Sequence, residues 1–376
     1  MKIDDKTSHN SPSLRFPEFT GEWEYFSIND VCSEFKSGKN IKADLISSNG
    51  NFPVYGGNGL RGYTSSYNHD GLYVLIGRQG ALCGNVRSVF GKIYITEHAI
   101  AVAGNEKSDT NFLHYLFLKM NLGQYSDQSA QPGLAVNKLL KLKVLLPSIS
   151  EQIKIAKLLS LLDERIAVQS RLIEDLKKLR CALEERMLGQ CQGKQVRLRD
   201  ILIERVEKSR INNQYEVLSS TVSGIYSQRE YFNKEIASAD NTGYKAIHRG
   251  DVVLSPQNLW MGNINYNDRF EIGIVSPSYK VFSIDEKFDK GYIAFLLKTR
   301  KALWAYSLVS EQGASIVRRN LNYESFLEIS FVIPSLKEQQ ATARRLSAFK
   351  QKHTMEEAFL RSLLLQKEFM LKSLFI

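Results

Sequence analysis

The chain has 376 residues, of which 43% are hydrophobic and 24% charged, and its formal net charge is +10. This length predicts two or three domains, and the hydrophobic content is ordinary for a globular protein. The basic excess is compatible with a polyanionic partner, but basic charge alone is weak evidence for nucleic-acid binding.

Cysteine usage and hydropathy exclude several classes of protein. Cys32, Cys83, Cys181 and Cys191 form neither a C-x-x-C pair nor a compact framework, so free thiols in a reducing compartment are expected. No stretch reaches the roughly 18 apolar residues of a membrane span, and the polar start lacks the apolar core of a signal peptide. We therefore expect a cytoplasmic protein that does not contact membranes and that has a disordered tail at residues 1–13.

Residues 14–146 are predicted to form a sheet-rich globular domain. Short apolar runs alternate with turn residues, and one helix is expected near 111–120. A literal G-x-G-x-x-G occurs at residues 57–62, but a dinucleotide site needs a helix directly after it, and turn and strand residues follow instead. We expect a flexible glycine-rich loop that holds Arg61 and Tyr63 near the surface.

A long helix is predicted at residues 147–188. Its sequence has no internal Pro, and Ser148 and Glu151 have the S-x-x-E spacing of a capping box. Apolar residues recur at helical spacing and form one stripe, which we call the seam: Leu159, Leu162, Ile166, Ile173, Leu176, Leu183 and Met187. At 1.5 Å per residue such a helix is roughly 60 Å long and needs a second helix to cover its seam.

The chain supplies that second helix at residues 334–376, as a copy at an offset of 187. Pro334-Ser335-Leu336-Lys337-Glu338-Gln339 repeats Pro147-Ser148-Ile149-Ser150-Glu151-Gln152, which predicts a second capping box from Ser335 to Glu338. The corresponding seam is Leu346, Phe349, His353, Leu360, Leu363, Met370 and Leu374. Antiparallel pairing of the two helices would place Gln169 near Glu356, Arg180 against Ala343 and Lys367 against Ala156, and we predict that these polar positions fix the register.

The duplication extends to the globular parts. A linker at 189–195 precedes a second globular domain at 196–333, and residues 253–264 repeat residues 75–86 at an offset of 178, with the same apolar pair, Gln and Gly-Asn. The predicted fold class is mixed α+β. Two similar sheet-rich globular domains, related as a pseudo-twofold tandem duplication, are joined by two long helices in an antiparallel coiled coil.

Chemistry-bearing residues are found in the expected loops. No catalytic constellation, phosphate-binding loop or metal-ligand spacing is present, so neither catalytic nor metal-binding residues are predicted. The loops instead carry amide, basic and aromatic side chains that can contact DNA. The candidates are Arg61, Tyr63, Arg78, Gln79, Asn85, Gln131, Lys138, Lys245, Arg249, Gln257, Asn258, Trp260, Asn263, Arg318 and Arg319. Because Gln79/Gln257 and Asn85/Asn263 are identical in both copies, structural roles for these four residues are an open alternative.

The layout resembles the specificity subunit of type I restriction-modification enzymes. The resemblance rests on two globular regions, each followed by a long helix that begins Pro-Ser-x-x-Glu-Gln, and it covers the chain from about Leu14 to Ile376. Local matches to the target recognition domains of that family are Val54-Tyr55-Gly56-Gly57-Asn58-Gly59, Ile76-Gly77-Arg78-Gln79-Gly80 and Ala130-Gln131-Pro132-Gly133-Leu134.

The resemblance implies a non-catalytic, double-stranded-DNA-binding subunit without its own cofactor. Each target recognition domain would read one half of a bipartite sequence, and the helices would fix the gap between the halves. Two methyltransferase subunits using S-adenosylmethionine, and restriction subunits using ATP and Mg²⁺, would be its partners. The alternatives are a coiled-coil scaffold whose globular halves bind proteins, and an enzyme such as a fused methyltransferase, against which the missing motifs argue.

Overall fold

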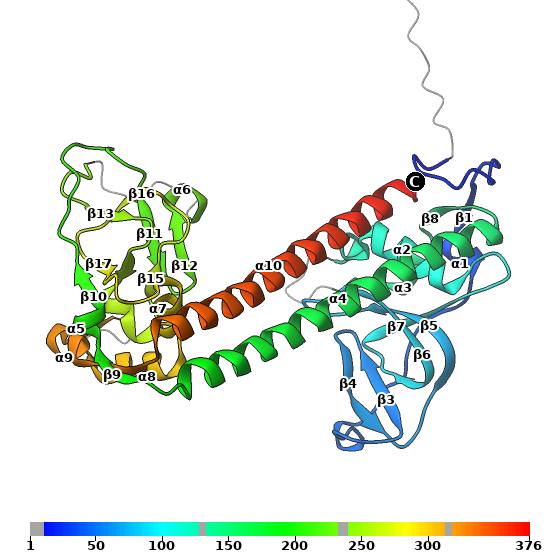
Figure 1. The fold of residues 1–376 in the computed structure, drawn as a ribbon. Helices are drawn as coiled ribbons and strands as arrows, with labels where there is room; N and C mark the ends of the chain where they lie inside the picture. Colours follow the sequence, from blue (N-terminus) through cyan, green and yellow to red (C-terminus); the bar gives the residue numbers. More distant parts are fainter. Residues whose placement is uncertain (1–10, 128–132, 232–239, 313–317) are drawn as a thin grey trace, which may run out of the picture. The chain divides into compact units, whose positions relative to one another are not determined.

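A computed structural model describes residues 11–127, 133–231, 240–312 and 318–376 (Figure 1). The chain divides into two compact units, one made of 1–170 and 358–376 and the other of 171–357. This division differs from the linear one expected from sequence, because each unit includes one globular region and a part of both long helices.

The first unit is built around a six-stranded sheet with the order β2-β7-β5-β6-β3-β4. Neighbouring strands are antiparallel except for β3 and β6, which run parallel. Its strands are β2 (Cys32–Ser37), β3 (Phe52–Gly56), β4 (Gly59–Thr64), β5 (His69–Gly77), β6 (Val86–Ile95) and β7 (Ala99–Gly104). A separate antiparallel pair joins β1 (Glu24–Ser27) to β8 (Lys143–Leu146), so the entry and exit of the globular region lie side by side.

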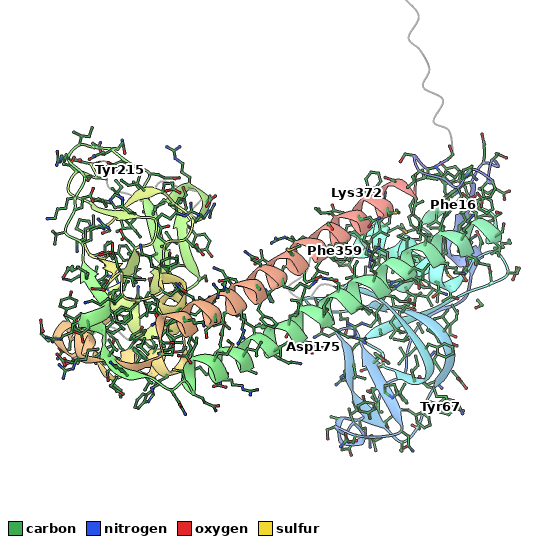
Figure 2. All side chains as sticks on the ribbon, in the orientation of Figure 1. Phe16, Tyr67, Asp175, Tyr215, Phe359 and Lys372 are labelled. Carbon is green, nitrogen blue, oxygen red and sulfur yellow. The ribbon has the colours of Figure 1, made fainter. Side chains whose placement is uncertain are left out.

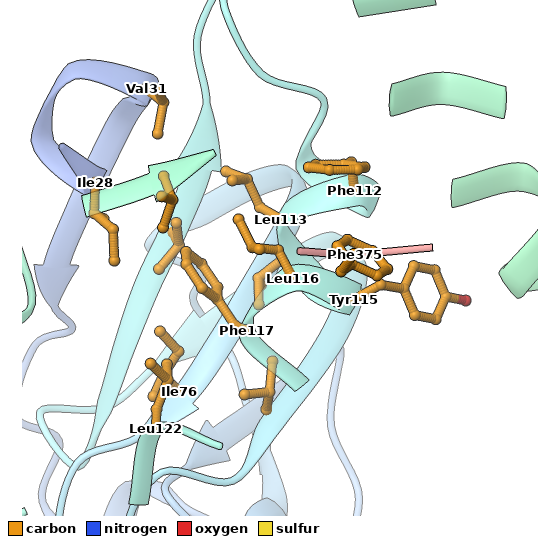
Figure 3. Close-up of a cluster of buried hydrophobic side chains, with 14 of the residues drawn as sticks. Ile28, Val31, Ile76, Phe112, Leu113, Tyr115, Leu116, Phe117, Leu122 and Phe375 are labelled. Atoms are coloured by element: carbon orange, nitrogen blue, oxygen red, sulfur yellow. The ribbon is translucent and has the colours of Figure 1, made fainter. Parts of the chain in front are cut away.

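The helices of this globular region are short except for α2 (Thr110–Met120), which contains the helix predicted near 111–120. The others are α1 (Ile28–Val31), α3 (Val136–Leu139), and the 3₁₀ turns η1 (Ala43–Leu45) and η2 (Leu122–Tyr125). Helix α2 buries Phe112, Leu116 and Phe117 against one face of the sheet, and Phe375 from the end of the chain joins the same core (Figure 3). The globular region and the C-terminal helix end thus share one apolar core.

The second unit repeats this plan with a smaller sheet. Strands β10 (Leu202–Glu204), β17 (Lys280–Ile284), β14 (Val252–Leu254) and β15 (Ile264–Tyr266) lie in the order β10-β17-β14-β15, which corresponds to β2-β7-β5-β6. Strands β9 (Lys194–Arg197) and β20 (Ser330–Ile333) pair as β1 and β8 do. The remaining strands form three antiparallel pairs: β11 (Leu218–Thr221) with β12 (Gly224–Ser227), β13 (Lys245–His248) with β16 (Ile272–Val275), and β18 (Ser310–Gln312) with β19 (Arg319–Leu321).

The helices of the second globular region are α5 (Leu198–Ile201), α6 (Gln228–Tyr231), α7 (Lys290–Leu296), α8 (Arg300–Leu308), α9 (Tyr323–Glu328) and the 3₁₀ turn η3 (Pro256–Met261). Helix α7 matches α2, because Asp109 and Asp289 cap the two helices in the same way, each accepting a hydrogen bond from the backbone N–H three residues later. The internal duplication predicted from the sequence is therefore present in the strand order and in the helix caps.

The long helices α4 (Ile149–Gly189) and α10 (Leu336–Ser373) run antiparallel within each unit (Figure 1). In the first unit Leu159 packs in the core that contains Leu374. Farther along the helices, the guanidinium of Arg165 lies 5.2 Å from the ring centroid of Phe359, which is labelled in Figure 2. In the second unit Leu183 and Leu188 pack with Leu346. All predicted seam positions are buried or half-buried, which confirms the apolar stripe on both helices.

In the first turn of each long helix, a buried glutamine fixes the helix to its globular region. Gln152 accepts a hydrogen bond from the backbone N–H of Asp109 (2.9 Å), while its amide donates to the backbone oxygens of Pro147 and Lys107 (2.9 and 3.0 Å). Gln339 repeats the first two bonds with Asp289 and Pro334 (both 2.9 Å). The last residue of the repeated Pro-Ser-x-x-Glu-Gln motif therefore acts as a clasp between helix and domain.

Only one of the two predicted capping boxes forms. Glu338 accepts hydrogen bonds from the backbone and hydroxyl of Ser335, as expected. The prediction for Ser148 and Glu151 is wrong, because Glu151 is buried and binds Arg15 through two hydrogen bonds of 2.8 and 2.7 Å. A guanidinium provides a stronger, charge-assisted partner for a buried carboxylate than a hydroxyl does.

Two of the predicted register residues form ion pairs with acidic residues of α4. Lys367 pairs with Asp163 at 2.5 Å, and Arg180 pairs with Glu184 at 3.4 Å. Their placement against Ala156 and Ala343 stays a prediction. Gln169 and Glu356 belong to different units, and their proximity stays a prediction.

Candidate nucleic-acid interface

The candidate site in each unit is a loop that joins two neighbouring strands of the sheet. In the first unit the β5–β6 loop spans 78–85, and in the second the β14–β15 loop spans 255–263. The strand register that flanks them is the same, since Ile76 pairs with Val86 and Leu254 with Ile264. The offset of 178 found in the sequence therefore marks equivalent loops.

A left-handed glycine explains the repeated Gly-Asn pair of these loops. Gly84 has φ +85° and Gly262 has φ +88°, a conformation that strains residues with a Cβ atom. The next backbone carbonyl, of Asn85 or Asn263, accepts a hydrogen bond from Gly77 (2.8 Å) or Ser255 (3.0 Å), which closes each loop in the same way. The shared residues build a common frame, and the others are displayed on it.

In the first unit, several candidate residues converge on the β5–β6 loop. Arg78 is half-buried, and Gln79 and Asn85 are exposed. Gln79 contacts the ring of His98 at 3.1 Å and forms a bridge with Gly133, so the segment near 133 reaches the same loop. Gln131, predicted in that segment, lies outside the described residues.

Arg61 and Tyr63 lie on strand β4, so the flexible loop expected at 57–62 is wrong. The segment is a β-hairpin in which Gly56 pairs with Gly59, because Gly57 and Asn58 form a tight turn. The strand that follows also excludes a dinucleotide site, which requires a helix at this point. Arg61 is exposed at the edge of the sheet, whereas Tyr63 is half-buried and pairs through its backbone with Ser47.

The structure adds Arg87 to this group, a residue that the sequence analysis missed. It is exposed on β6 two residues after Asn85, and its guanidinium lies against Gly59, where a Cβ atom would come within 2.7 Å of it. The strand alternation of Val86, Arg87 and their neighbours could have identified it as outward-facing. Lys138, on α3, is exposed but forms an ion pair with Asp127 at 2.7 Å.

In the second unit, Gln257, Asn258 and Trp260 occupy η3 within the β14–β15 loop. Strand β19 packs against this turn and brings Arg319 over the Trp260 ring, with its guanidinium carbon 4.1 Å from the ring centroid. Arg318 is exposed directly before this strand. Four candidates from two separate sequence segments thus meet at one end of the sheet, with Arg318 beside them.

Asn263 is not part of this exposed group, and its prediction as a DNA contact is wrong. Its side chain is 4% exposed, accepts a hydrogen bond from the Ser220 hydroxyl (2.7 Å) and donates to the Ser220 backbone oxygen (3.0 Å). Both ends of the amide are therefore used to attach the β14–β15 loop to β11. This result favours the structural alternative left open for the repeated asparagine.

Lys245 and Arg249 lie away from the Trp260 group. Lys245 is half-buried on β13 and donates to the backbone oxygen of Tyr279 at 2.6 Å, and burial, together with nearby Lys280, lowers its pKa. Arg249 follows β13, at the opposite end of β14 from η3, and pairs with Glu271 at 2.5 Å. Neither basic side chain adds an uncompensated charge to the β14–β15 loop.

A lysine that the sequence analysis did not select supports the same loop. Lys298 donates to the backbone oxygens of Gly262 (2.9 Å) and Val222 (3.3 Å), and desolvation of its ammonium group lowers its pKa to about 8. It ties the end of the β14–β15 loop to the β11–β12 turn. The loop therefore rests on a fixed hydrogen-bonded support from Lys298 and Asn263.

Among the described residues, no group of three or more metal-ligating side chains occurs, and no helix is long and apolar enough to cross a membrane. Each unit presents arginine and amide side chains on a loop held by a duplicated frame. Fold and site together define a class of two-domain proteins in which a long helix follows each globular region.

Comparison with known proteins agrees with this class. Residues 20–178 match the family model described as the type I restriction modification DNA specificity domain. The EcoprrI specificity subunit of a type I restriction enzyme from Escherichia coli is 45% identical over 154 residues, which are 40% of this chain and 38% of that protein. The match thus spans less than two fifths of the length of this curated relative.

Solved structures cover more of the chain at lower identity. The S subunit of a type I restriction-modification system from M. genitalium has a TM-score of 0.66 and 18% identity, covering 97% of this chain and 99% of that one. A chain from a study of complex assembly in a type I system has a TM-score of 0.54 and 12% identity, covering 94% and 97%. At these identities the likeness is one of fold. The comparisons therefore show a type I restriction modification DNA specificity domain at residues 20–178 and a likeness of fold to these solved chains over most of the sequence.

Proposed function

We propose that this chain is the DNA-reading subunit of a type I restriction-modification complex. Each globular region reads one half of a bipartite duplex target, and α4 and α10 set the gap between the halves. The observation that carries the proposal is the duplicated loop frame, on which the first unit displays Arg78 and Gln79 and the second Gln257 and Trp260. A shared frame with different polar side chains is what two readers of different base sequences require.

The chain itself is proposed to be non-catalytic and to act in the cytoplasm. Adenine methylation would be done by two methyltransferase subunits that bind S-adenosylmethionine, and cleavage by restriction subunits that use ATP and Mg²⁺. The net charge of +10 supports a DNA partner, since basic side chains neutralise phosphates and release counterions.

The test is to co-express the full chain with a partner methyltransferase and to map methylated adenines in the host DNA. The proposal expects one bipartite motif with a fixed gap, whereas a continuous motif or no motif would contradict it. Replacing residues 14–146 by the equivalent region of a relative should change only one half of the motif. This exchange also assigns each half to its globular region.

A protein-binding scaffold without DNA specificity is distinguished by binding measurements on the assembled complex. Sequence-specific DNA binding should weaken steeply as salt rises and should favour the mapped motif over a scrambled duplex by at least about 1,000-fold. Equal affinity for both duplexes would favour the scaffold.

A further inference from the structure

We propose that Arg319, stacked on Trp260, recognises a guanine in the half-site that the second globular region reads. This inference rests on the proposed function and assigns one base to one residue of the same site. It is carried by the geometry of the pair, by the absence of a carboxylate partner for Arg319 among the residues that the structure describes, and by a contrast with the first unit.

The stack holds the arginine in a defined orientation. The guanidinium carbon of Arg319 lies 4.1 Å from the ring centroid of Trp260, which is within the range of a cation–π contact. Trp260 is held by η3 and Arg319 by the first residue of β19, and the two elements pack together. A planar group lying on a ring can move little, so its amino groups are oriented before a ligand arrives.

The positive charge of Arg319 is not neutralised by a carboxylate among the described residues, so it can attract a ligand. Other arginines of this unit bind carboxylates: Arg205 with Asp251, Arg249 with Glu271 and Arg269 with Glu230. Arg319 has no such partner among the described residues, and its Nε atom is buried without a hydrogen-bond acceptor. Because the Nε edge faces the protein, the two terminal amino groups are the donors that remain.

A base edge fits this arrangement better than a phosphate does. A phosphate accepts hydrogen bonds from many directions and needs no fixed orientation of the donor. Guanine offers O6 and N7 in one plane on the major-groove edge, and an arginine fork binds both at once. Since the indole covers one face of Arg319, approach in the plane of the guanidinium is favoured.

In the described part of the first unit, no arginine stacks on a ring at the equivalent position. The residue equivalent to Trp260 at the offset of 178 is Leu82, which is 44% exposed. A leucine offers no ring on which a guanidinium could stack. The two units are thus expected to read different bases at equivalent positions, and the target is expected to be asymmetric.

The experiment uses the full chain co-expressed with its partner methyltransferase, with adenine methylation mapped genome-wide. The half-site assigned to 196–333 should contain a guanine. Arg319→Ala should reduce discrimination at that one position by about 10- to 100-fold, while the other half-site and the gap stay unchanged. Arg319→Lys keeps the charge but not the fork, so it should relax the same position.

Two further variants separate recognition from folding. Trp260→Leu, which copies the first unit, should relax the same position to a smaller extent. Arg269→Ala removes an exposed arginine that pairs with Glu230 at the opposite end of β14, and it should leave the motif unchanged. Unfolding temperatures of the assembled variants show whether each one is folded.

Three results would overturn the assignment: a half-site without guanine, full discrimination in Arg319→Lys, or a uniform loss of methylation in Arg319→Ala without relaxation at any position. The last result would indicate a phosphate contact. A wild-type complex that methylates no bipartite motif would instead refute the proposed function, and the assignment with it.

Discussion

The β5–β6 loop of the first unit and the β14–β15 loop of the second have the same backbone frame but use it differently. Asn85 is exposed, whereas its counterpart Asn263 is buried and bonded to Ser220. Leu82 stands where the second unit has Trp260. Residues that are identical in the two copies therefore maintain the shared backbone geometry of the loops. The residues that differ are the better candidates for base recognition.

The largest expected effect is that of Gly84→Ala. The residue has φ +85°, and a Cβ atom would lie 2.2 Å from the backbone nitrogen of Gly123, which cannot move away independently. We expect a loss of about 4 kcal/mol in the free energy of unfolding of the first unit, from backbone strain and overpacking together. This free energy is measured by urea titration of the full chain, with unfolding of the first unit followed by hydrogen exchange in the peptides that cover residues 14–146.

The matched change Gly262→Ala should cost less, about 2 kcal/mol, from the left-handed backbone alone. Its Cβ would meet Cδ2 of Leu303 at 2.8 Å, the end of a side chain that can rotate. Equal losses for the two variants would show that the two loops are not held in the different ways described.

The glutamine clasps at the helix starts should have a smaller effect than Gly84→Ala. Gln152→Ala would leave the backbone N–H of Asp109 without its partner in a buried site, at a cost of about 3 kcal/mol. Gln339→Ala removes one hydrogen bond fewer and should cost about 2 kcal/mol. Hydrogen exchange in the first turns of α4 and α10 is the measurement, and unchanged protection there would contradict the role of the clasp.

The acidic residues before these glutamines, Glu151 and Glu338, should also contribute unequally to stability, with the larger contribution in the first unit. Glu151→Ala breaks a buried pair with Arg15 and should cost about 2 kcal/mol, whereas Glu338→Ala removes an exposed cap and should have a smaller effect. The double variant Arg15→Ala/Glu151→Ala should be hardly worse than Glu151→Ala in denaturant unfolding. Additive losses would mean that the two side chains act independently.

The smallest effect is a pH dependence confined to the first unit. Burial lowers the pKa of His114 to about 4, while the equivalent of His114 in α7 is Ala294. The folded protein holds this histidine neutral, so its contribution to stability is complete above the ordinary pKa of about 6.5 and is lost as the pH falls toward 4. At pH 5.5 the loss is about 1 kcal/mol.

The measurement compares the wild type with His114→Gln in denaturant titrations at pH 7.5 and 5.5. The variant should lose less stability than the wild type between the two values. A parallel decrease in both proteins would assign the pH dependence to other groups.

Sequence patterns predicted the parts of the fold that depend on local chemistry and periodicity. The apolar seam defined both long helices, and the offset of 178 identified the equivalent loops before their strands were known. The Glu151–Arg15 pair was missed because it joins residues 136 positions apart, and nothing in the spacing of either residue indicates it. The burial of Asn263 was likewise inaccessible, since it depends on Ser220, which is 43 positions away in the sequence.

At the candidate interface, the loops selected from sequence are equivalent in the two units, but the sequence did not show which of their side chains pack together. Trp260 and Arg319 were each chosen as single residues, and their stacking follows from the packing of β19 on η3. Arg87 was missed although its neighbours were chosen. Residue type thus predicts which side chains can read DNA, and only tertiary packing decides which of them are held in place to do so.

The glutamine clasps also bear on how such a protein can change during evolution. Because Gln152 and Gln339 fix the rotation of the first helical turns, one residue inserted in α4 would turn everything beyond it by about 100° while lengthening the helix by about 1.5 Å. Seven residues nearly restore the rotation, to within about 20°. Related proteins that remain functional should therefore differ in the length of α4 by multiples of seven residues, with a matching change in α10. The length of the helical spacer should thus change in steps during evolution.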